Sequence, residues 1–449
     1  MRRKIYDQLK LWKQESNGRT AILIDGARRV GKSYIVQQFA QNEYRSALIV
    51  DFGSAPTSIK QLFDNYIDDL DTLFLNLTTY YHVQLHPRQS VVVFDEVQEC
   101  PRARAAIKYL VADGRYDYIE TGSLTSLRRN VKNIIIPSEE QHLKMSPKDF
   151  EEFLWASGNE QMMDTIAHCF HLRKPLGQLL HRKAMDLFRQ YLIVGGMPQA
   201  VAEYVHSRSF EQVDKVKRTI LDLYRTDIYK YAEGYEAKVA DIFDEIPAQL
   251  QKHEKKFSLA ALKPGARFRD YENAFLWLRE AMIVYTCHNT TAPNIGLRLN
   301  RDTTTLKCYM ADTGLLISLA FDENGLLNND IYAKLLLDKL EINQGMIAEN
   351  VVAQMLQTAG HTLYFYSKAS PVADDRMEID FLIRKPTPTN RHNISPIEVK
   401  SGARYTTSSL NKLMKKFGPY LATPYIIHSA DLRIDEPICY LPYYMTPLL

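Results

Sequence analysis

The sequence has few cysteines and lacks any long apolar run. Its 449 residues contain five cysteines, and no two of them form a C-x-x-C pair. Zinc-binding and disulfide-based scaffolds are therefore not supported, and we expect a reducing, cytoplasmic location. No stretch of the chain is apolar over the length that a bilayer requires, so we expect no membrane-spanning segment and no membrane partner.

A strong excess of charge of one sign is also missing. The chain has 56 lysines and arginines against 53 aspartates and glutamates, which gives a formal net charge of +3. This balance neither requires nor excludes a nucleic-acid partner. The basic residues Arg2, Arg3 and Lys4 are not followed by an apolar region, so we expect no secretory signal. The length allows about two to four domains.

What the sequence does contain is a glycine-rich loop with a defined spacing. Residues 26–33 read GARRVGKS, which fits the P-loop (Walker A) pattern GxxxxGK[ST]. An apolar strand pattern precedes the loop and a helical pattern follows it, so backbone N–H groups and the helix dipole would bind phosphates there. We expect Lys32 to reach the β- and γ-phosphates of ATP and Ser33 to bind Mg²⁺. The expected nucleotide-binding residues are Gly26, Ala27, Arg28, Arg29, Val30, Gly31, Lys32, Ser33 and Tyr34.

A second motif ends in two acids. Residues 90–96 read SVVVFDE, a continuous apolar run that is typical of a parallel strand buried on both faces. Acids at the carboxyl end of such a strand lie at the edge of the sheet where ligands bind. We expect Asp95 to hold Mg²⁺ (the Walker B position) and Glu96 to polarise the attacking water, because phosphoryl transfer depends mostly on positioning and electrostatics.

A third polar group follows the predicted strand at residues 116–120. Thr121 and Ser123 stand directly after it, where a hydroxyl can sense the γ-phosphate, and they complete the catalytic candidates with Lys32 and Glu96. The alternative is that they cap the next helix. Strand and helix patterns alternate across residues 1–146, which predicts a parallel α/β ATPase core.

Two further segments have different patterns. Residues 147–255 show amphipathic helices and predict a helical lid. Residues 256–330 show a helix followed by two strands that carry basic residues, which predicts a winged helix-turn-helix module. Such a module either contacts duplex DNA or serves only as a packing element, and the sequence leaves both open. The lysine and arginine residues in and between the two predicted strands are Arg298, Arg301 and Lys307.

Residues 331–449 predict another α/β domain with its own candidate site. Glu349 lies in a helical pattern, Asp380 in a strand, and Glu398 and Lys400 on one face of a further strand, because strand residues alternate faces. The carboxylates would form a hard oxygen site for Mg²⁺, and the lysine would stabilise a hydroxide or a phosphate oxygen. This pattern predicts a PD-(D/E)xK nuclease-like domain, either active or able to bind DNA without cutting it.

These motifs resemble the prokaryotic AAA-family ATPases that are fused to a C-terminal restriction-endonuclease-like domain, the domain of unknown function 4143. The resemblance implies an α/β multidomain chain with an AAA core, a helical lid, a winged helix and a nuclease-like fold, and an ATP-dependent switch on nucleic acid. It covers nearly the whole chain and rests on the segments GARRVGKS, VVVFDEVQ, IETGS, SPKDFEEFL, GGMP, ADTGLL, AEN, EID and IEVKSG.

One departure from that family concerns an arginine. Many relatives carry a Gly-Arg pair just before the segment that matches SPKDFEEFL, whereas residues 136–140 of this chain read IPSEE. An arginine finger for a neighbouring subunit would have to come from elsewhere, and Arg128 and Arg129 are candidates that also suit a solvated helix end. A homo-oligomer is therefore left open.

Three functional hypotheses follow. The first is an ATP-hydrolysing, Mg²⁺-dependent switch whose C-terminal domain engages DNA. The second is a Mg²⁺-dependent DNA endonuclease that ATP only regulates. The third is a nucleotide-sensing adaptor that binds a protein partner and neither cuts nor reads DNA.

Overall fold

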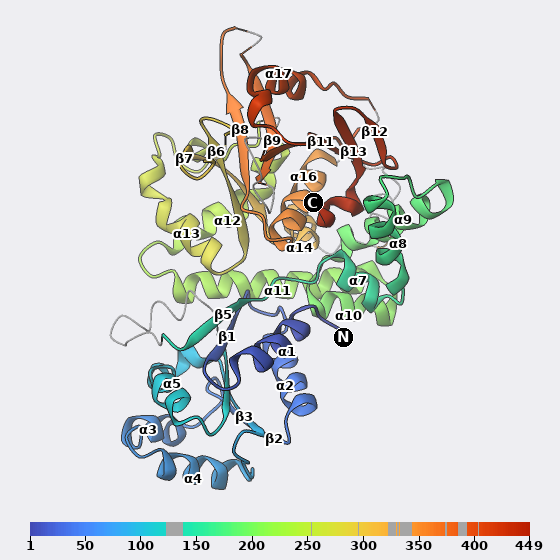
Figure 1. The fold of residues 1–449 in the computed structure, drawn as a ribbon. Coiled ribbons are helices and arrows are strands. Elements are labelled where there is room, and N and C mark those ends of the chain that lie inside the picture. Colours follow the sequence, from blue (N-terminus) through green and yellow to red (C-terminus); the bar gives the residue numbers. More distant parts are fainter. Residues whose placement is uncertain are drawn as a thin grey trace. The chain divides into compact units, whose positions relative to one another are not determined.

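The protein forms two compact units, each with its own sheet and core (Figure 1). The N-terminal unit comprises Met1–Ser146 with Glu280–Met282, and the C-terminal unit comprises Pro147–Arg279 with Ile283–Leu449. The structure is a computed structural model that describes residues 1–122, 138–252, 254–294, 296–321, 329, 332, 344–372, 375–384, 393–402 and 404–449.

The N-terminal unit is built on a parallel five-stranded sheet with the order β2-β3-β4-β1-β5. The strands are β1 (Ala21–Asp25), β2 (Ser46–Asp51), β3 (Ser90–Asp95), β4 (Asp117–Gly122) and β5 (Glu140–Lys144). Because the strands are parallel, their carboxyl ends meet at one edge of the sheet. In this order β4 lies between β1, which leads into the P-loop, and β3, which ends in the predicted acids.

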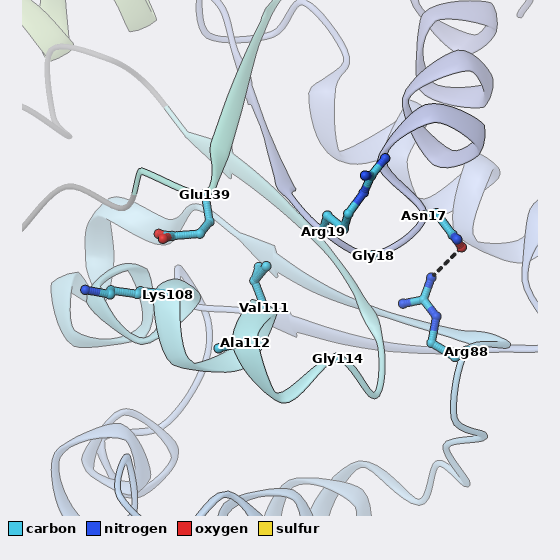
Figure 2. A pocket seen from close by; sticks show the side chains of 9 residues that line it. All are labelled: Asn17, Gly18, Arg19, Arg88, Lys108, Val111, Ala112, Gly114 and Glu139. Atoms are coloured by element: carbon cyan, nitrogen blue, oxygen red, sulfur yellow. Dashed lines mark hydrogen bonds between the residues drawn. The ribbon is translucent and has the colours of Figure 1, made fainter.

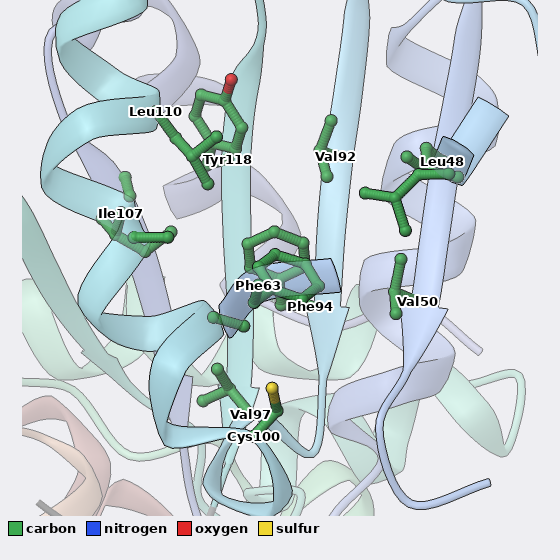
Figure 3. Packing of buried hydrophobic residues seen from close by; sticks show 14 of the residues in the cluster. Leu48, Val50, Phe63, Val92, Phe94, Val97, Cys100, Ile107, Leu110 and Tyr118 are labelled. Atoms are coloured by element: carbon green, nitrogen blue, oxygen red, sulfur yellow. The ribbon is translucent and has the colours of Figure 1, made fainter. Parts of the chain in front are cut away.

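Helices cover both faces of this sheet, so its central strands are apolar throughout. Val91 and Val93 of β3 are as deeply buried as Val92 and Phe94, which face the opposite side. Figure 3 shows the core around Phe94, whose ring contacts Phe63 edge-on with ring centroids 5.4 Å apart. The helices are α1 (Ile5–Ser16), α2 (Lys32–Glu43), α3 (Thr57–Asn65), α4 (Leu70–Tyr81), η1 (Val97–Glu99) and α5 (Pro101–Asp113).

The C-terminal unit begins with a helical region, as the sequence predicted for residues 147–255. Its helices are α7 (Phe150–Ala156), α8 (Glu160–His171), α9 (Gln178–Val194), α10 (Pro198–Ser207), α11 (Phe210–Tyr231) and α12 (Glu236–Gln251). The remaining helices among the described residues of the unit are η2 (Leu259–Ala261), η3 (Phe268–Asp270), α13 (Glu272–Glu280), α14 (Thr313–Ala320), α16 (Gln344–Thr358), α17 (Ser408–Phe417), η5 (Gly418–Tyr420) and η6 (Tyr443–Leu448).

Two glycine segments, GGMP and ADTGLL, meet inside this unit. A Cβ atom on Gly196 would lie 2.0 Å from the carbonyl oxygen of Lys148, and one on Gly314 would lie 2.6 Å from the Cα of Gly195. The Asp312 carboxylate accepts hydrogen bonds from the N–H groups of Gly196 (2.5 Å) and Leu315 (2.8 Å). The close approach leaves no room for a side chain, which explains why glycine stands at these positions.

A mixed eight-stranded sheet forms the rest of the C-terminal unit, with the order β12-β13-β11-β10-β9-β8-β6-β7. The strands are β6 (Val284–Thr290), β7 (Arg301–Met310), β8 (Tyr364–Lys368), β9 (Met377–Arg384), β10 (Ile394–Val399), β11 (Tyr425–His428), β12 (Arg433–Asp435) and β13 (Ile438–Pro442). In the parts of the chain that the structure describes, every helix is too short or too polar to span a lipid bilayer.

The hairpin of β6 and β7 belongs to this same sheet. β6 pairs in parallel with β8, with His288 opposite Tyr364. The sequence had placed the hairpin in a winged helix-like segment (256–330) separate from the C-terminal domain (331–449), but no boundary between sheets falls there. The physical reason is a strand pairing between segments far apart in the chain, which local patterns do not reveal. The four-domain division and the winged-helix assignment stay predictions.

Candidate functional site

The P-loop lies between β1 and α2, and two of its glycines are required by geometry. Gly31 has φ 96° and ψ 26° at the start of α2, a left-handed conformation that favours glycine. A Cβ atom on Gly26 would lie 2.4 Å from the carbonyl oxygen of Met145, so a side chain there would collide with the backbone after β5. The loop is thus fixed in shape next to the first turn of α2.

Lys32 lies inside this loop and is 7% exposed. Its ammonium donates to the carbonyl oxygens of Gly26 (2.9 Å) and Ala27 (3.2 Å). Burial lowers the pKa of Lys32, while the nearby carboxylates of Glu96 and Asp95 oppose that effect. The cation is therefore held within the segment that the sequence predicts to bind phosphates.

Side chains from three elements meet at the Asp95 carboxylate. Ser33 Oγ, from α2, donates to Asp95 Oδ1 at 3.0 Å. The hydroxyl of Thr121, from β4, donates to the same oxygen and accepts from the backbone N–H of Glu96 at 3.2 Å. Hydroxyl and carboxylate oxygens are the ligands that Mg²⁺ prefers, and Mg²⁺ commonly uses one or two carboxylates together with substrate phosphates. The residues present fit that ion.

Glu96 has an unusual backbone conformation directly after β3. Its φ is 51° and its ψ 48°, in the left-handed region, which costs about 1 kcal/mol for a residue with a side chain. The side-chain amide of Gln98, which is 5% exposed, donates to Glu96 Oε2. Gln98 was not among the predicted site residues, although its place two residues after the second acid, in VVVFDEVQ, was the signal for it.

Asp25 is a second residue that the sequence analysis missed. It is the last residue of β1, directly before the first glycine of the loop, and it is 1% exposed. Among the described residues, neither of its carboxylate oxygens has a hydrogen-bond partner. Burial raises its pKa to about 6, although Lys144 and His142 oppose the rise. The signal in the sequence was an acid at the carboxyl end of a buried strand.

Some predicted residues fall outside the described part of the chain. Ser123, and the two arginines Arg128 and Arg129, are among them. Thr121 is fully buried, and its hydroxyl is engaged by Asp95 and Glu96.

The four predicted nuclease-like residues lie on neighbouring elements but form two separate sets of ion pairs. Glu398, in β10, pairs with Lys400 at 2.6 Å. Asp380, in β9, accepts a hydrogen bond from the backbone N–H of Val399 at 2.8 Å. Glu349, in α16, pairs instead with lysines from earlier in the chain. The arrangement therefore differs from the predicted convergence on a magnesium ion.

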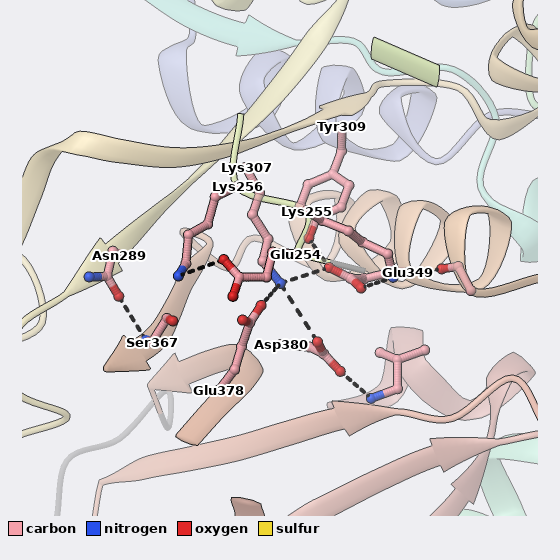
Figure 4. A network of polar contacts seen from close by, with 12 residues as sticks. Glu254, Lys255, Lys256, Asn289, Lys307, Tyr309, Glu349, Ser367, Glu378 and Asp380 are labelled. Carbon is pink, nitrogen blue, oxygen red and sulfur yellow. Dashed lines mark hydrogen bonds and ion pairs between the residues drawn. The ribbon is translucent and has the colours of Figure 1, made fainter. Parts of the chain in front are cut away.

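Lys307, from β7, occupies the centre of the acidic residues (Figure 4). Its Nζ lies 3.0 Å from Glu349 Oε1, 3.0 Å from Glu378 Oε1 and 3.6 Å from Asp380 Oδ1. Burial by itself would lower the pKa of Lys307, but the carboxylates of Glu349, Asp380 and Glu378 outweigh it and raise the pKa above its ordinary value. Lys307 is 1% exposed, so it is unavailable to the DNA that the predicted basic hairpin would contact.

The residues present do not fit a divalent cation at this place. Within the described residues, no group of three or more His, Cys, Asp or Glu side chains is arranged to hold a metal ion. The sequence pattern correctly placed acids on α16, β9 and β10, but it could not show that an ammonium from β7 lies among them.

The N-terminal unit also has a shallow depression of about 500 Å³ (Figure 2). Several of its lining residues directly precede strands: Gly18 and Arg19 precede β1, Arg88 precedes β3 and Glu139 precedes β5. It therefore lies at the amino ends of the parallel strands, opposite the edge where such sheets bind ligands. Arg88 is paired with Asp117 at 3.0 Å, and we assign no function to this depression.

Three families match successive parts of the chain. Residues 18–154 match the AAA domain, residues 185–326 match a domain of unknown function (DUF8612), and residues 344–443 match a second domain of unknown function (DUF4143). The DUF8612 match crosses the predicted boundary between the helical lid and the winged helix. No curated protein shows significant similarity to the chain.

Solved structures similar to the chain include three proteins, all of low sequence identity. Cdc6p from Pyrobaculum aerophilum has 11% identity and a TM-score of 0.25, over 75% of this chain and 94% of that chain. Drosophila ORC bound to DNA has 14% identity and a TM-score of 0.28, over 72% of this chain and 95% of that chain. The Aeropyrum pernix ORC1 protein in complex with DNA has 11% identity and a TM-score of 0.23, over 72% of this chain and 93% of that chain.

The family matches and the site geometry agree on the N-terminal unit. The match to the AAA domain spans β1, the P-loop, the acids after β3 and Thr121 after them. The predicted AAA-type P-loop core and the predicted domain of unknown function 4143 are confirmed, whereas the restriction-endonuclease-like nature of the latter stays a prediction. The chain thus carries an AAA-type P-loop ATPase domain in its N-terminal unit and a domain of unknown function, DUF4143, near its C-terminus.

Proposed function

We propose that this chain is an AAA-type ATPase that binds and hydrolyses Mg-ATP at the P-loop. The observation that carries the proposal is the meeting of Ser33 and Thr121 on one oxygen of Asp95. This arrangement brings together a predicted metal ligand from α2, one from β3 and a hydroxyl from β4. A phosphate in the loop would lie within reach of all three elements.

Each residue has a separate task in this proposal. Backbone N–H groups of the loop and the start of α2 bind the phosphates, and the Lys32 ammonium moves from the loop carbonyls to the phosphate oxygens. Ser33 and Asp95 would hold Mg²⁺, and that ion would supply positive charge to the phosphates. Glu96 orients and polarises the attacking water, and the amide of Gln98 fixes the direction of its carboxylate.

The test is ATP turnover by the purified full-length chain and by Glu96→Gln. We expect the substitution to abolish turnover while ATP still binds, because the amide cannot polarise water but leaves the loop unchanged. Lys32→Ala should weaken binding and turnover together. Glu99→Gln is the matched control, since Glu99 is an exposed acid in the same turn, and it should keep full activity. Turnover by Glu96→Gln at the wild-type rate would refute the assigned role.

We further propose that the C-terminal unit engages DNA. Arg298 and Leu299 are exposed in the connection between β6 and β7, and Arg301 is exposed at the first position of β7; Leu299 is 90% exposed. Two guanidinium groups beside an exposed apolar side chain suit contacts with phosphates and with the sugar or base edges of a nucleic acid. Metal-dependent cleavage is not part of this proposal, because Lys307 lies among the acids that would bind the metal.

DNA binding is tested by fluorescence anisotropy with labelled duplex and single-stranded DNA at low salt, where phosphate contacts are strongest. We expect binding that weakens with salt and that the double variant Arg298→Ala/Arg301→Ala largely loses. Arg102→Ala, an exposed arginine on α5, is the control and should bind like the wild type. A chain that binds no DNA at low salt would favour an adaptor that recognises a protein partner.

A further inference from the structure

The acidic residues of the C-terminal sheet already surround a cation. Glu378 and Asp380 are two residues apart on β9, so their side chains share a face, and Glu349 approaches from α16. Three carboxylates from two elements are the kind of set that binds a hard divalent cation. Here the ammonium of Lys307 lies at ion-pair distance from all three (Figure 4).

Glu349 has no oxygen left for a metal. Its Oε1 accepts from Lys307 at 3.0 Å and from the hydroxyl of Tyr309, and its Oε2 pairs with Lys255. Although burial opposes ionisation, Lys307 and Lys255 lower the pKa of Glu349 to about 2. The carboxylate is therefore charged, and its charge is balanced by two ammonium groups of the same chain.

Asp380 and Glu398 cannot replace Glu349 as metal ligands. Asp380 uses one oxygen for the backbone N–H of Val399 and directs the other toward Lys307. Glu398 is 3% exposed and pairs with Lys400. A divalent cation would have to displace Lys307, and Lys307 is 1% exposed, so its ammonium would be left buried without its partners. Burying an unpaired charge is strongly unfavourable.

We propose that Lys307 is the built-in cation of this carboxylate cluster, so that the C-terminal domain takes no divalent metal and acts without cleaving phosphodiesters. The cation comes from outside the segment that carries the acids. Lys307, Lys255 and Tyr309 lie within the DUF8612 match at residues 185–326, whereas Glu349, Glu378 and Asp380 lie within the DUF4143 match at residues 344–443. The DUF8612 segment thus supplies the cation that occupies the carboxylate cluster of the DUF4143 segment.

The test is Mn²⁺ binding by the nucleotide-free full-length chain, measured by electron paramagnetic resonance. Wild type and Asp380→Asn should bind the same number of Mn²⁺ ions with the same affinity, because the cluster takes none. Lys307→Met removes the ammonium and keeps an unbranched side chain, so it should bind one additional Mn²⁺ per chain. The double variant Lys307→Met/Asp380→Asn should lose that ion.

Controls keep the outcomes distinct. Lys256→Met, a neighbouring lysine that pairs with Glu254 at 3.6 Å, should bind Mn²⁺ like the wild type. Circular dichroism checks that each variant is folded. A Mn²⁺ ion on the wild type that Asp380→Asn removes would overturn the proposal, and so would a folded Lys307→Met chain that gains no ion. If Lys307→Met does not fold, the comparison of wild type with Asp380→Asn decides alone.

Discussion

At the scale of single residues, the Thr121 hydroxyl links the two acids that follow β3. It donates to Asp95 Oδ1 and accepts from the N–H of Glu96, so it fixes both the metal ligand and the backbone of the water-polarising acid. The sequence could suggest this residue only from its place after a strand. The sheet order, with β4 between β1 and β3, is what brings the hydroxyl to Asp95.

We predict that Thr121→Val lowers kcat for ATP by about 10-fold to 100-fold, because hydrogen bonds to charged groups are worth about 1.5–3 kcal/mol. Valine keeps the shape and the strand preference but lacks the hydroxyl. The affinity for ATP should change little, since the loop is untouched. Steady-state ATPase assays measure both quantities. Thr121→Ser should restore most of kcat, and wild-type kcat in Thr121→Val would contradict the role.

Asp25 leads to a prediction about pH. Burial raises its pKa from 3.8 to about 6. Between about pH 4 and 6 the carboxyl group of Asp25 is therefore protonated in the folded chain and ionised in the unfolded chain. Stability is therefore lost as the pH rises through this window, and the full penalty applies above pH 6. Each pH unit of difference is worth about 1.4 kcal/mol, which makes the penalty about 3 kcal/mol.

Urea unfolding at pH 4, 5 and 8 tests this prediction, with Trp12 as the reporter for the N-terminal unit after Trp155 and Trp277 are replaced by phenylalanine. Asp25→Asn should unfold at higher urea than its parent at pH 8 and show a smaller loss of stability between pH 4 and 8. Asp64→Asn, which changes an exposed acid, should behave like the parent. An unchanged pH profile in Asp25→Asn would show that another group titrates.

At the scale of elements, the sequence predicts best what depends on neighbouring residues. The strand, loop and helix around the P-loop follow from a local pattern, as does the buried strand β3. The parallel pairing of β6 with β8 joins residues about 75 positions apart, such as His288 and Tyr364. The place of Lys307 among the acids has the same cause, because Glu349 is 42 residues further along the chain. Patterns over a few residues reveal neither the pairing of β6 with β8 nor the position of Lys307.

The close approach of the turn after α9 to the segment before α7 gives a prediction at this scale. Gly196→Ala places a methyl group 2.0 Å from the carbonyl oxygen of Lys148, which the backbone can relieve only by moving. We expect a loss of about 1–3 kcal/mol in the free energy of unfolding, typical of overpacking. Urea unfolding followed by the fluorescence of Trp155, after Trp12 and Trp277 are replaced by phenylalanine, measures it. Gly418→Ala, where the added Cβ meets nothing within 4 Å, should cost far less.

At the scale of the whole molecule, the question is whether the ATPase unit responds to what the C-terminal unit binds. If the chain is a DNA-dependent switch, duplex or single-stranded DNA should raise ATP turnover several-fold. Arg298→Ala/Arg301→Ala should keep the basal rate and lose the stimulation, because neither residue belongs to the P-loop site. The measurement is steady-state ATP turnover with and without DNA. Turnover that ignores DNA would favour a protein partner for the C-terminal unit.

The shared sheet has a consequence for how this C-terminal domain is inherited. β6 and β7 extend the sheet beyond β8, and β7 also supplies the lysine that neutralises the acids on α16 and β9. A fragment that starts at residue 331 would lose both strands, expose the edge of β8 and leave its carboxylates to repel one another. We therefore expect that residues 331–449 cannot be transferred to another protein as an independent domain. Gene fusion or exchange would have to move residues 284–310 together with it to preserve a foldable protein.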